Sequence, residues 1–253
     1  MTTFVLVPGF WLGAWAWHST AAELRRHGHD VYPISLTGLG ERTHLARPDT
    51  DFDVHVTDVV NLLRYEDLCD VILVGHSYAG SVVTAAADRV TDRVAQLVYI
   101  DTGPLPDGVA QVEFTPPAER ERNAALVADH GDGWRLPSPP WVDLSAGVPD
   151  VDDSIVTLLR ERSVDQPWAT ATAPVRLDGA WEKLPRLGVL SSFTAAQVQR
   201  MAATMPLYRH MAGDAWRYEE LPTWHWPMLN RPAELAAILH HAWLSGRGCT
   251  PRT

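Results

Sequence analysis

Short apolar runs alternate along most of the chain with longer stretches in which apolar residues recur at helical spacing. The short runs predict six buried strands, at residues 4–7, 31–35, 71–74, 96–100, 187–193 and 216–221. The longer stretches predict helices at residues 14–27, 54–64, 82–87, 195–203 and 232–244. Strands that alternate with helices form parallel sheets joined by right-handed crossovers. We therefore expect an α/β domain whose parallel six-stranded sheet is flanked by helices.

The alternation stops between residues 104 and 185, where proline recurs and regular spacing is scarce. Two helical pieces remain there, at residues 117–129 and 152–163. We interpret residues 104–185 as a mostly helical lid inserted into a core domain formed by residues 1–103 and 186–253. A lid at this place covers the carboxyl edge of the sheet. We expect it to be more mobile than the sheet, above all at residues 131–147.

The composition excludes several classes of function. The chain has 253 residues, which suits one large domain, and 46% of them are hydrophobic. Its net charge of −10, without a basic cluster, argues against nucleic acid and anionic membranes as partners. No stretch approaches the roughly 20 apolar residues of a membrane span, and the N-terminus shows no signal peptide. Cys69 and Cys249 suggest neither a disulfide framework nor a metal site. We expect a cytoplasmic protein, and the oligomeric state stays open, with a homodimer among the alternatives.

The strand at residues 71–74 leads into a turn that carries a serine. The sequence continues G-H-S-Y-A-G, so Ser77 stands between Gly75 and the small residues Ala79 and Gly80, ahead of a helix. A serine between a buried strand and a helix forms the nucleophile elbow, in which small neighbours let strand and helix approach closely. The usual pattern has glycine where Ala79 stands, a difference of one methyl group. We predict that Ser77 is a nucleophile rather than a helix-capping serine.

A serine nucleophile needs a general base, and eleven histidines are available. His225 follows the last predicted strand in L-P-T-W-H-W-P-M, at the sheet edge where the serine also lies. His76 adjoins the serine, but consecutive residues in a tight turn point apart, which favours a structural role. Helical pieces carry His210, His240 and His241, where we expect packing or surface positions. We therefore predict His225 as the base.

Two further features complete the predicted site. A tetrahedral oxyanion needs two backbone N–H donors, which we assign to Tyr78, directly after the nucleophile, and Phe10, in the loop after the first strand. Eleven tryptophans suit an aromatic or polycyclic ligand. We expect Trp11, Trp141 and Trp224 to contact the substrate. The alternative is that the lid tryptophans pack only the lid's own core; these are Trp134, Trp141 and Trp168.

Four segments resemble the α/β-hydrolase superfamily. They read V-L-V-P-G-F-W-L-G-A-W-A-W, V-I-L-V-G-H-S-Y-A-G, L-V-Y-I-D-T-G and L-P-T-W-H-W-P-M-L-N-R-P. More narrowly, they resemble the small lid-bearing branch that contains plant methylesterases, plant hydroxynitrile lyases and related bacterial esterases. The resemblance covers the chain apart from the lid. Pro8 departs from the usual histidine of the first loop, and Trp224 departs from a glycine common in related bacterial chains. The usual acid after residues 187–193 is absent.

The acid therefore has to come from elsewhere, because a catalytic histidine needs a carboxylate on its second nitrogen. The segment L-S-S-F-T-A-A-Q offers only hydroxyls, at Ser191, Ser192 and Thr194. Asp101 ends the strand at residues 96–100, at the same sheet edge, and some α/β hydrolases carry their acid at this alternative place. We predict Asp101 as the acid. Asp178 and Asp214 are weaker candidates, and the other interpretation of Asp101 is that it only caps the following turn.

The resemblance implies a serine hydrolase that cleaves a carboxylic ester through an acyl-enzyme. A methyl ester or lactone of an aromatic or polycyclic acid fits best, and no metal or organic cofactor is implied. A hydroxynitrile lyase of this branch carries a threonine in the first loop and a lysine after the histidine, whereas Phe10 or a neighbour and Trp226 stand here. A cyclase or cofactor-free oxygenase, which would stay active after Ser77→Ala, is an open alternative. So is a ligand-binding protein with a vestigial triad.

Overall fold

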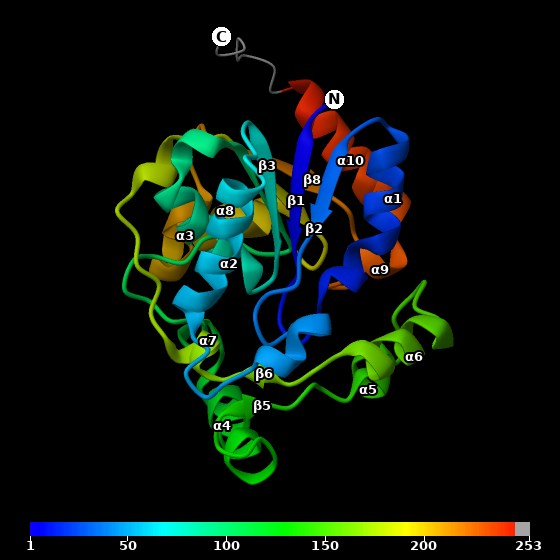
Figure 1. The fold of residues 1–253 in the computed structure, drawn as a ribbon, viewed down its shortest axis with the longest axis vertical. Helices are drawn as coiled ribbons and strands as arrows, with labels where there is room; N and C mark the ends of the chain where they lie inside the picture. The colour runs from blue at the N-terminus through cyan, green and yellow to red at the C-terminus, as the bar shows by residue number, and fades with distance from the viewer. Residues whose placement is uncertain (246–253) are drawn as a thin grey trace.

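A sheet of six parallel strands runs through the centre of the molecule (Figure 1). The structure is a computed structural model that describes residues 1–245, so Cys249 lies outside the described residues. The strand order is β2-β1-β3-β4-β7-β8, and each pair of neighbours is parallel. The strands are β1 (Thr3–Val7), β2 (Asp30–Pro33), β3 (Val71–His76), β4 (Val94–Ile100), β7 (Arg186–Leu190) and β8 (Trp216–Glu220). The predicted sheet is therefore confirmed.

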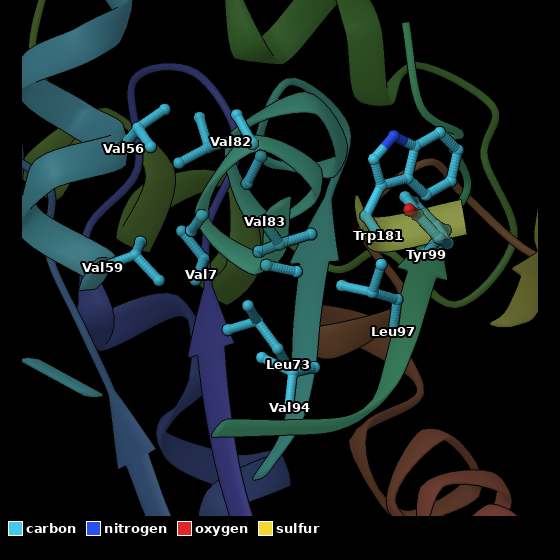
Figure 2. Packing of buried hydrophobic residues seen from close by; sticks show 14 of the residues in the cluster. Val7, Val56, Val59, Leu73, Val82, Val83, Val94, Leu97, Tyr99 and Trp181 are labelled. Atoms are coloured by element: carbon cyan, nitrogen blue, oxygen red, sulfur yellow. The ribbon is translucent and has the colours of Figure 1, made fainter. Parts of the chain in front are cut away.

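Helices cover both faces of the sheet (Figure 1). One face carries α1 (His18–Arg26) and α10 (Pro232–Ser245), with the short α9 (Pro227–Asn230) beside them. The other face carries α2 (Phe52–Tyr65), α3 (Ala79–Arg89) and α8 (Ala195–Thr204). A separate apolar cluster fills each of the two layers. Figure 2 shows the second layer, where Val59 of α2 and Val83 of α3 lie against Val7 and Leu73 of the sheet.

The helix boundaries follow local hydrogen bonding. The helix predicted over residues 54–64 begins earlier, at Phe52, because the side chain of Asp51 caps it by accepting from the Val54 N–H at 3.0 Å. The stretch predicted over residues 14–27 opens with a 3₁₀ turn at Ala14–Trp17 before α1 begins. No helix among residues 1–245 has the length and hydropathy needed to cross a membrane.

Residues 104–185 connect β4 to β7, and residues 117–172 lie at the carboxyl ends of the strands, at the bottom of Figure 1. Their elements are a 3₁₀ turn at Gln111–Phe114, α4 (Pro117–His130), β5 (Arg135–Leu136), α5 (Trp141–Ser145), α6 (Asp153–Arg162), β6 (Gln166–Pro167) and α7 (Ala169–Thr172). The antiparallel pairing of β5 with β6 is an addition to the predicted helical pieces. The last part of the segment returns to the core, where Val175 and Trp181 are buried in the same cluster as the side chains of α3.

Candidate active site

Ser77 stands at the sharp turn between β3 and α3. Its φ of 52° lies in the left-handed region, which residues other than glycine adopt at an energetic cost. A Cβ on Gly75 would lie 2.5 Å from the backbone oxygen of Ala79, and one on Gly80 would lie 2.6 Å from Cγ2 of Thr102. The two glycines therefore allow strand, turn and helix to approach. The methyl group of Ala79 is fully buried at this junction.

Asp101 ends β4, also in a left-handed conformation with φ of 50°, and its side chain is 1% exposed. Its Oδ1 accepts hydrogen bonds from the backbone N–H groups of Ser191 at 2.9 Å and Ser192 at 2.8 Å. Its Oδ2 accepts from the Ser192 hydroxyl at 2.6 Å. Because these two N–H groups turn toward the carboxylate, β7 ends at Leu190 rather than at the predicted residue 193. The serines that occupy the usual place of the acid thus hold Asp101.

His225 Nδ1 lies 2.6 Å from Asp101 Oδ2. The Nε2–H of His76 donates to the backbone oxygen of His225 at 2.8 Å, and the two rings lie 4.8 Å apart. With Nδ1 occupied by Asp101, Nε2 of His225 is the ring nitrogen left for another partner. No hydrogen bond joins His225 to Ser77 within residues 1–245, although both line the same cavities. Such bonds are often long until substrate binds.

Burial and hydrogen bonds set the ionisation of two residues in this group. Burial opposes ionisation of Asp101, but hydrogen bonds from His225 and Ser192, together with the charge of His225, outweigh it and lower the pKa of Asp101 to about 2. Burial also lowers the pKa of His76 to about 3, so its ring stays neutral. The neighbour of the serine is therefore a support for the backbone of His225.

The two predicted oxyanion donors flank the elbow. A Cβ on Gly9 would lie 3.0 Å from the Cβ of Ser77, so the loop after β1 lies directly against Ser77. The rings of Phe10 and Tyr78 pack with centroids 4.4 Å apart. Within the described chain, no protein acceptor binds the backbone N–H of Phe10 or of Tyr78. Two such N–H groups beside a serine match the arrangement predicted for oxyanion donors.

Two cavities meet at the serine, with volumes of about 270 Å³ and about 340 Å³. Ser77, Gln111 and His225 line both of them. The first lies under the lid, and its aromatic and polar walls include Phe10, Trp11, Trp168, Trp226, Arg120 and Asn123. The second is more apolar, with walls that include Phe114, Leu190, Phe193, Met201, Tyr208 and Met211.

Of the three tryptophans predicted to contact substrate, only Trp11 lines these two cavities. Trp141 is 2% exposed and lies behind the wall, with its ring 6.0 Å from that of Trp11 and 5.1 Å from that of Trp226. Trp224 packs against Trp226 and lines a separate cavity on the other side of His225. Trp141 and Trp224 are thus absent from the walls of these two cavities, and their contact with substrate stays a prediction. The loop turns at His225, so Trp226 takes the lining position under the lid.

The competing acids lie elsewhere. Asp178 is exposed, and its backbone N–H donates to Asp88. Asp214 is exposed and precedes β8, at the amino end of that strand. Within residues 1–245, Asp101 is the carboxylate that pairs with His225. No group of three or more histidine, cysteine, aspartate or glutamate side chains in that part of the chain is arranged to hold a metal ion.

Known proteins resemble this chain in sequence and structure. Residues 4–238 match the model of the alpha/beta hydrolase family. A carbendazim hydrolyzing esterase from a Nocardioides species is 34% identical over 248 residues, which cover 94% of this chain and 98% of that protein. Methylesterase 17 of Arabidopsis thaliana is 28% identical over 134 residues, which cover 53% of this chain and 47% of that protein.

A solved structure shares the fold over almost the whole length. It is an extracellular alpha/beta-hydrolase from a Paenibacillus species, described as sharing structural and functional homology with tobacco salicylic acid binding protein 2. The TM-score is 0.81 at 23% sequence identity, and the match covers 98% of this chain and 100% of that one. This likeness is one of fold.

Proposed function

Because this chain belongs to the alpha/beta hydrolase family, we propose that it is a serine esterase that cleaves a carboxylic ester through an acyl-enzyme. The observation that carries the proposal is the 2.6 Å contact between Asp101 Oδ2 and His225 Nδ1, at a sheet edge that also holds the strained Ser77. A histidine oriented by a carboxylate is the group that activates a serine hydroxyl. Relatives named as esterases support the same class of reaction.

In the first half-reaction, Ser77 Oγ attacks the carbonyl carbon of the ester while His225 Nε2 takes the hydroxyl proton. Asp101 stabilises the imidazolium that forms, since its carboxylate is charged and bonded to Nδ1. The N–H groups of Phe10 and Tyr78 receive the oxyanion. The bond between the carbonyl carbon and the alkoxy oxygen then breaks, and His225 gives its proton to the leaving alcohol.

In the second half-reaction, a water molecule attacks the acyl carbon and passes a proton to His225. The bond from the acyl carbon to Ser77 Oγ breaks, and the proton returns from His225 to the serine. The carboxylic acid leaves, and the enzyme is restored without any cofactor in the cycle.

The favoured substrate is an ester of an aromatic acid with a small alcohol, such as a methyl ester, or a lactone. Four aromatic side chains support this choice, since flat apolar rings suit an aromatic acyl group. They line the cavity of about 270 Å³ under the lid and are Phe10, Trp11, Trp168 and Trp226. The names of the relatives point the same way, because one hydrolyses carbendazim and another is a methylesterase.

The test is a panel of p-nitrophenyl esters, aryl methyl esters and carbendazim, assayed with wild type, Ser77→Ala and Ser81→Ala. Ser81 is a matched control because it is a buried serine of α3 that lines neither cavity. Removal of a triad nucleophile is expected to lower kcat by about 10⁴ to 10⁶. Turnover that survives Ser77→Ala would contradict the proposal and favour a cyclase or cofactor-free oxygenase. Tight binding without turnover in wild type would favour a ligand-binding protein.

A further inference from the structure

One side chain of residues 104–185 is hydrogen-bonded to the loop that carries the first oxyanion donor. Gln166 is 0% exposed, and its Oε1 accepts from the backbone N–H of Trp11 at 3.1 Å. Its Nε2 donates to the Thr170 hydroxyl at 2.8 Å, and that hydroxyl donates to the backbone oxygen of Pro167 at 2.6 Å. Because the hydroxyl has given its own proton to Pro167, it can only accept from Gln166. The amide therefore has one orientation that satisfies all partners.

Residues 104–185 form hydrogen bonds to both the N–H and the carbonyl oxygen of Trp11. Besides the bond to Gln166, its carbonyl oxygen accepts from the Val164 N–H at 3.0 Å, and its indole N–H donates to the Leu136 oxygen at 3.3 Å. Trp11 has a φ of 66°, a conformation that needs such support. The Trp11 N–H and the Phe10 carbonyl share one peptide plane. Holding that plane restrains the backbone of Phe10, the residue directly before it.

The second donor residue, Tyr78, is held by a hydrogen bond of its side chain to α2. The Tyr78 hydroxyl bonds to His55 Nδ1 at 3.0 Å, while His55 Nε2 donates to the Thr37 oxygen at 2.8 Å. Burial lowers the pKa of His55 to about 4, so the ring is neutral and Nδ1 accepts. The ring of Phe10 packs against that of Tyr78 with centroids 4.4 Å apart, so the two donor residues also support each other.

We propose that Gln166 is a positioning residue for the oxyanion hole, through which the lid sets the aim of the Phe10 N–H. The inference rests on the proposed function. Gln166 lines neither of the two cavities at Ser77, so it does not contact the substrate. Its loss is therefore expected to weaken binding of the transition state and to leave binding of the ester unchanged.

Gln166→Leu removes both bonds of the amide. We expect kcat to fall by about 10- to 100-fold, less than the roughly 10²- to 10³-fold that follows loss of an oxyanion donor itself, with KM within about twofold of wild type. An aryl trifluoromethyl ketone, which forms a tetrahedral adduct on a serine, should bind more weakly by a similar factor. The carboxylic acid product should bind as it does to wild type.

The pH dependence of kcat in Gln166→Glu distinguishes a positioning role from a purely structural one. An ionised carboxylate accepts from the Trp11 N–H but cannot donate to Thr170, whereas a protonated carboxyl can do both. Burial raises the pKa of a carboxyl, so protonation is expected within the range in which the enzyme is folded. The ratio of kcat in Gln166→Glu to kcat in wild type should therefore rise as the pH is lowered. The same ratio for Gln166→Leu should stay flat.

Thr84→Val is the matched control, since Thr84 is buried and lines neither cavity, and its hydroxyl bonds to the backbone oxygen of Gly80 at 2.7 Å and to Tyr99 at 2.9 Å. It should lose thermal stability and keep kcat within about twofold. A folded Gln166→Leu with the kcat of wild type overturns the inference. If Gln166→Leu does not fold, a flat pH ratio for Gln166→Glu overturns it instead. Labelling of wild-type Ser77 by a fluorophosphonate tests the proposed function separately, so the two failures are distinguishable.

Discussion

The two halves of the candidate site are supported in different ways. The half that we propose to handle the proton is held by the ends of the strands: Ser191 and Ser192 bind the carboxylate of Asp101, and His76 binds the backbone of His225. The half that we propose to receive the oxyanion is held by residues 104–185, with Gln166 as the side chain at its centre. The core of the fold therefore supports the first half, and residues 104–185 support the second.

The sheet and the outer helix of residues 104–185 also differ in burial. Every residue of β3 is buried, whereas Val127 is the single buried residue of α4. Segments with few buried apolar contacts open at a lower free energy than the core of a sheet. The proton-handling half is thus expected to be preformed, and the oxyanion half to depend on whether the lid is closed.

The largest expected effect lies in the first half. Asp101→Asn should lower kcat by about 10³ to 10⁴ and fold normally, because the amide favours the wrong tautomer of His225 and cannot stabilise its charged form. Steady-state kinetics with the best ester of the panel measures it. Asp178→Asn and Asp214→Asn are the controls, since both residues are exposed. Wild-type turnover in Asp101→Asn, with loss in either control, would remove Asp101 from the acid's role.

Amide hydrogen exchange compares the two halves directly. Backbone N–H groups of residues 131–147 should exchange at least about 100-fold faster, relative to their intrinsic rates, than those of β3. Exchange is measured by mass spectrometry on the free enzyme, and α4 serves as a second lid segment. Equal protection in residues 131–147 and in β3 would mean that the lid is as rigid as the sheet.

The charge of Asp101 also predicts a pH dependence of stability. Its pKa is lowered from 3.8 to about 2 in the folded state, so the ionised form favours folding. This contribution, about 2 kcal/mol, is fully present above the unfolded pKa, is about half lost near pH 3 and disappears as the pH falls through 2. Urea unfolding of wild type and Asp101→Asn between about pH 6 and pH 3 measures it. A free-energy difference that stays constant over this range would contradict the assignment.

A smaller effect is expected from the wall of the first cavity. Trp226→Ala should lower kcat/KM for aryl esters relative to acetate esters by about fivefold, the equivalent of roughly 1 kcal/mol of lost aromatic contact. Trp224→Ala is the comparison, because Trp224 lines a different cavity and should leave this ratio nearly unchanged. A larger change of this ratio in Trp224→Ala than in Trp226→Ala would support the prediction that Trp224 contacts the substrate.

The sheet could be predicted from the sequence because its signals are local. The run at residues 71–74 is continuous and apolar, and Gly75 stands where a Cβ would meet the helix. The comparisons confirm the predicted family and the expected class of ester hydrolase. The roles of Ser77, His225 and Asp101 stay predictions, although the structure places Asp101 against His225 as expected.

The supports of the site could not be predicted, because they join residues far apart in the chain. Ser192 binds a carboxylate 91 positions earlier, and Gln166 binds a backbone group 155 positions earlier. Neither contact produces a periodic pattern of residues in the sequence. The choice between Trp224 and Trp226 depends on how one loop turns at His225, which spacing does not encode. The one sequence feature that indicated such a support is the pair of serines that stands in place of the usual acid.

The central claim is that a covalent acyl-enzyme forms on Ser77. The most direct test is rapid quenching of wild type with an aryl p-nitrophenyl ester, followed by intact mass measurement and peptide mapping. We predict a mass increase equal to the acyl group, located on the peptide that contains Ser77, together with a burst of p-nitrophenol and no adduct in Ser77→Ala. Turnover without any adduct on that peptide, or an adduct that persists in Ser77→Ala, would contradict the account.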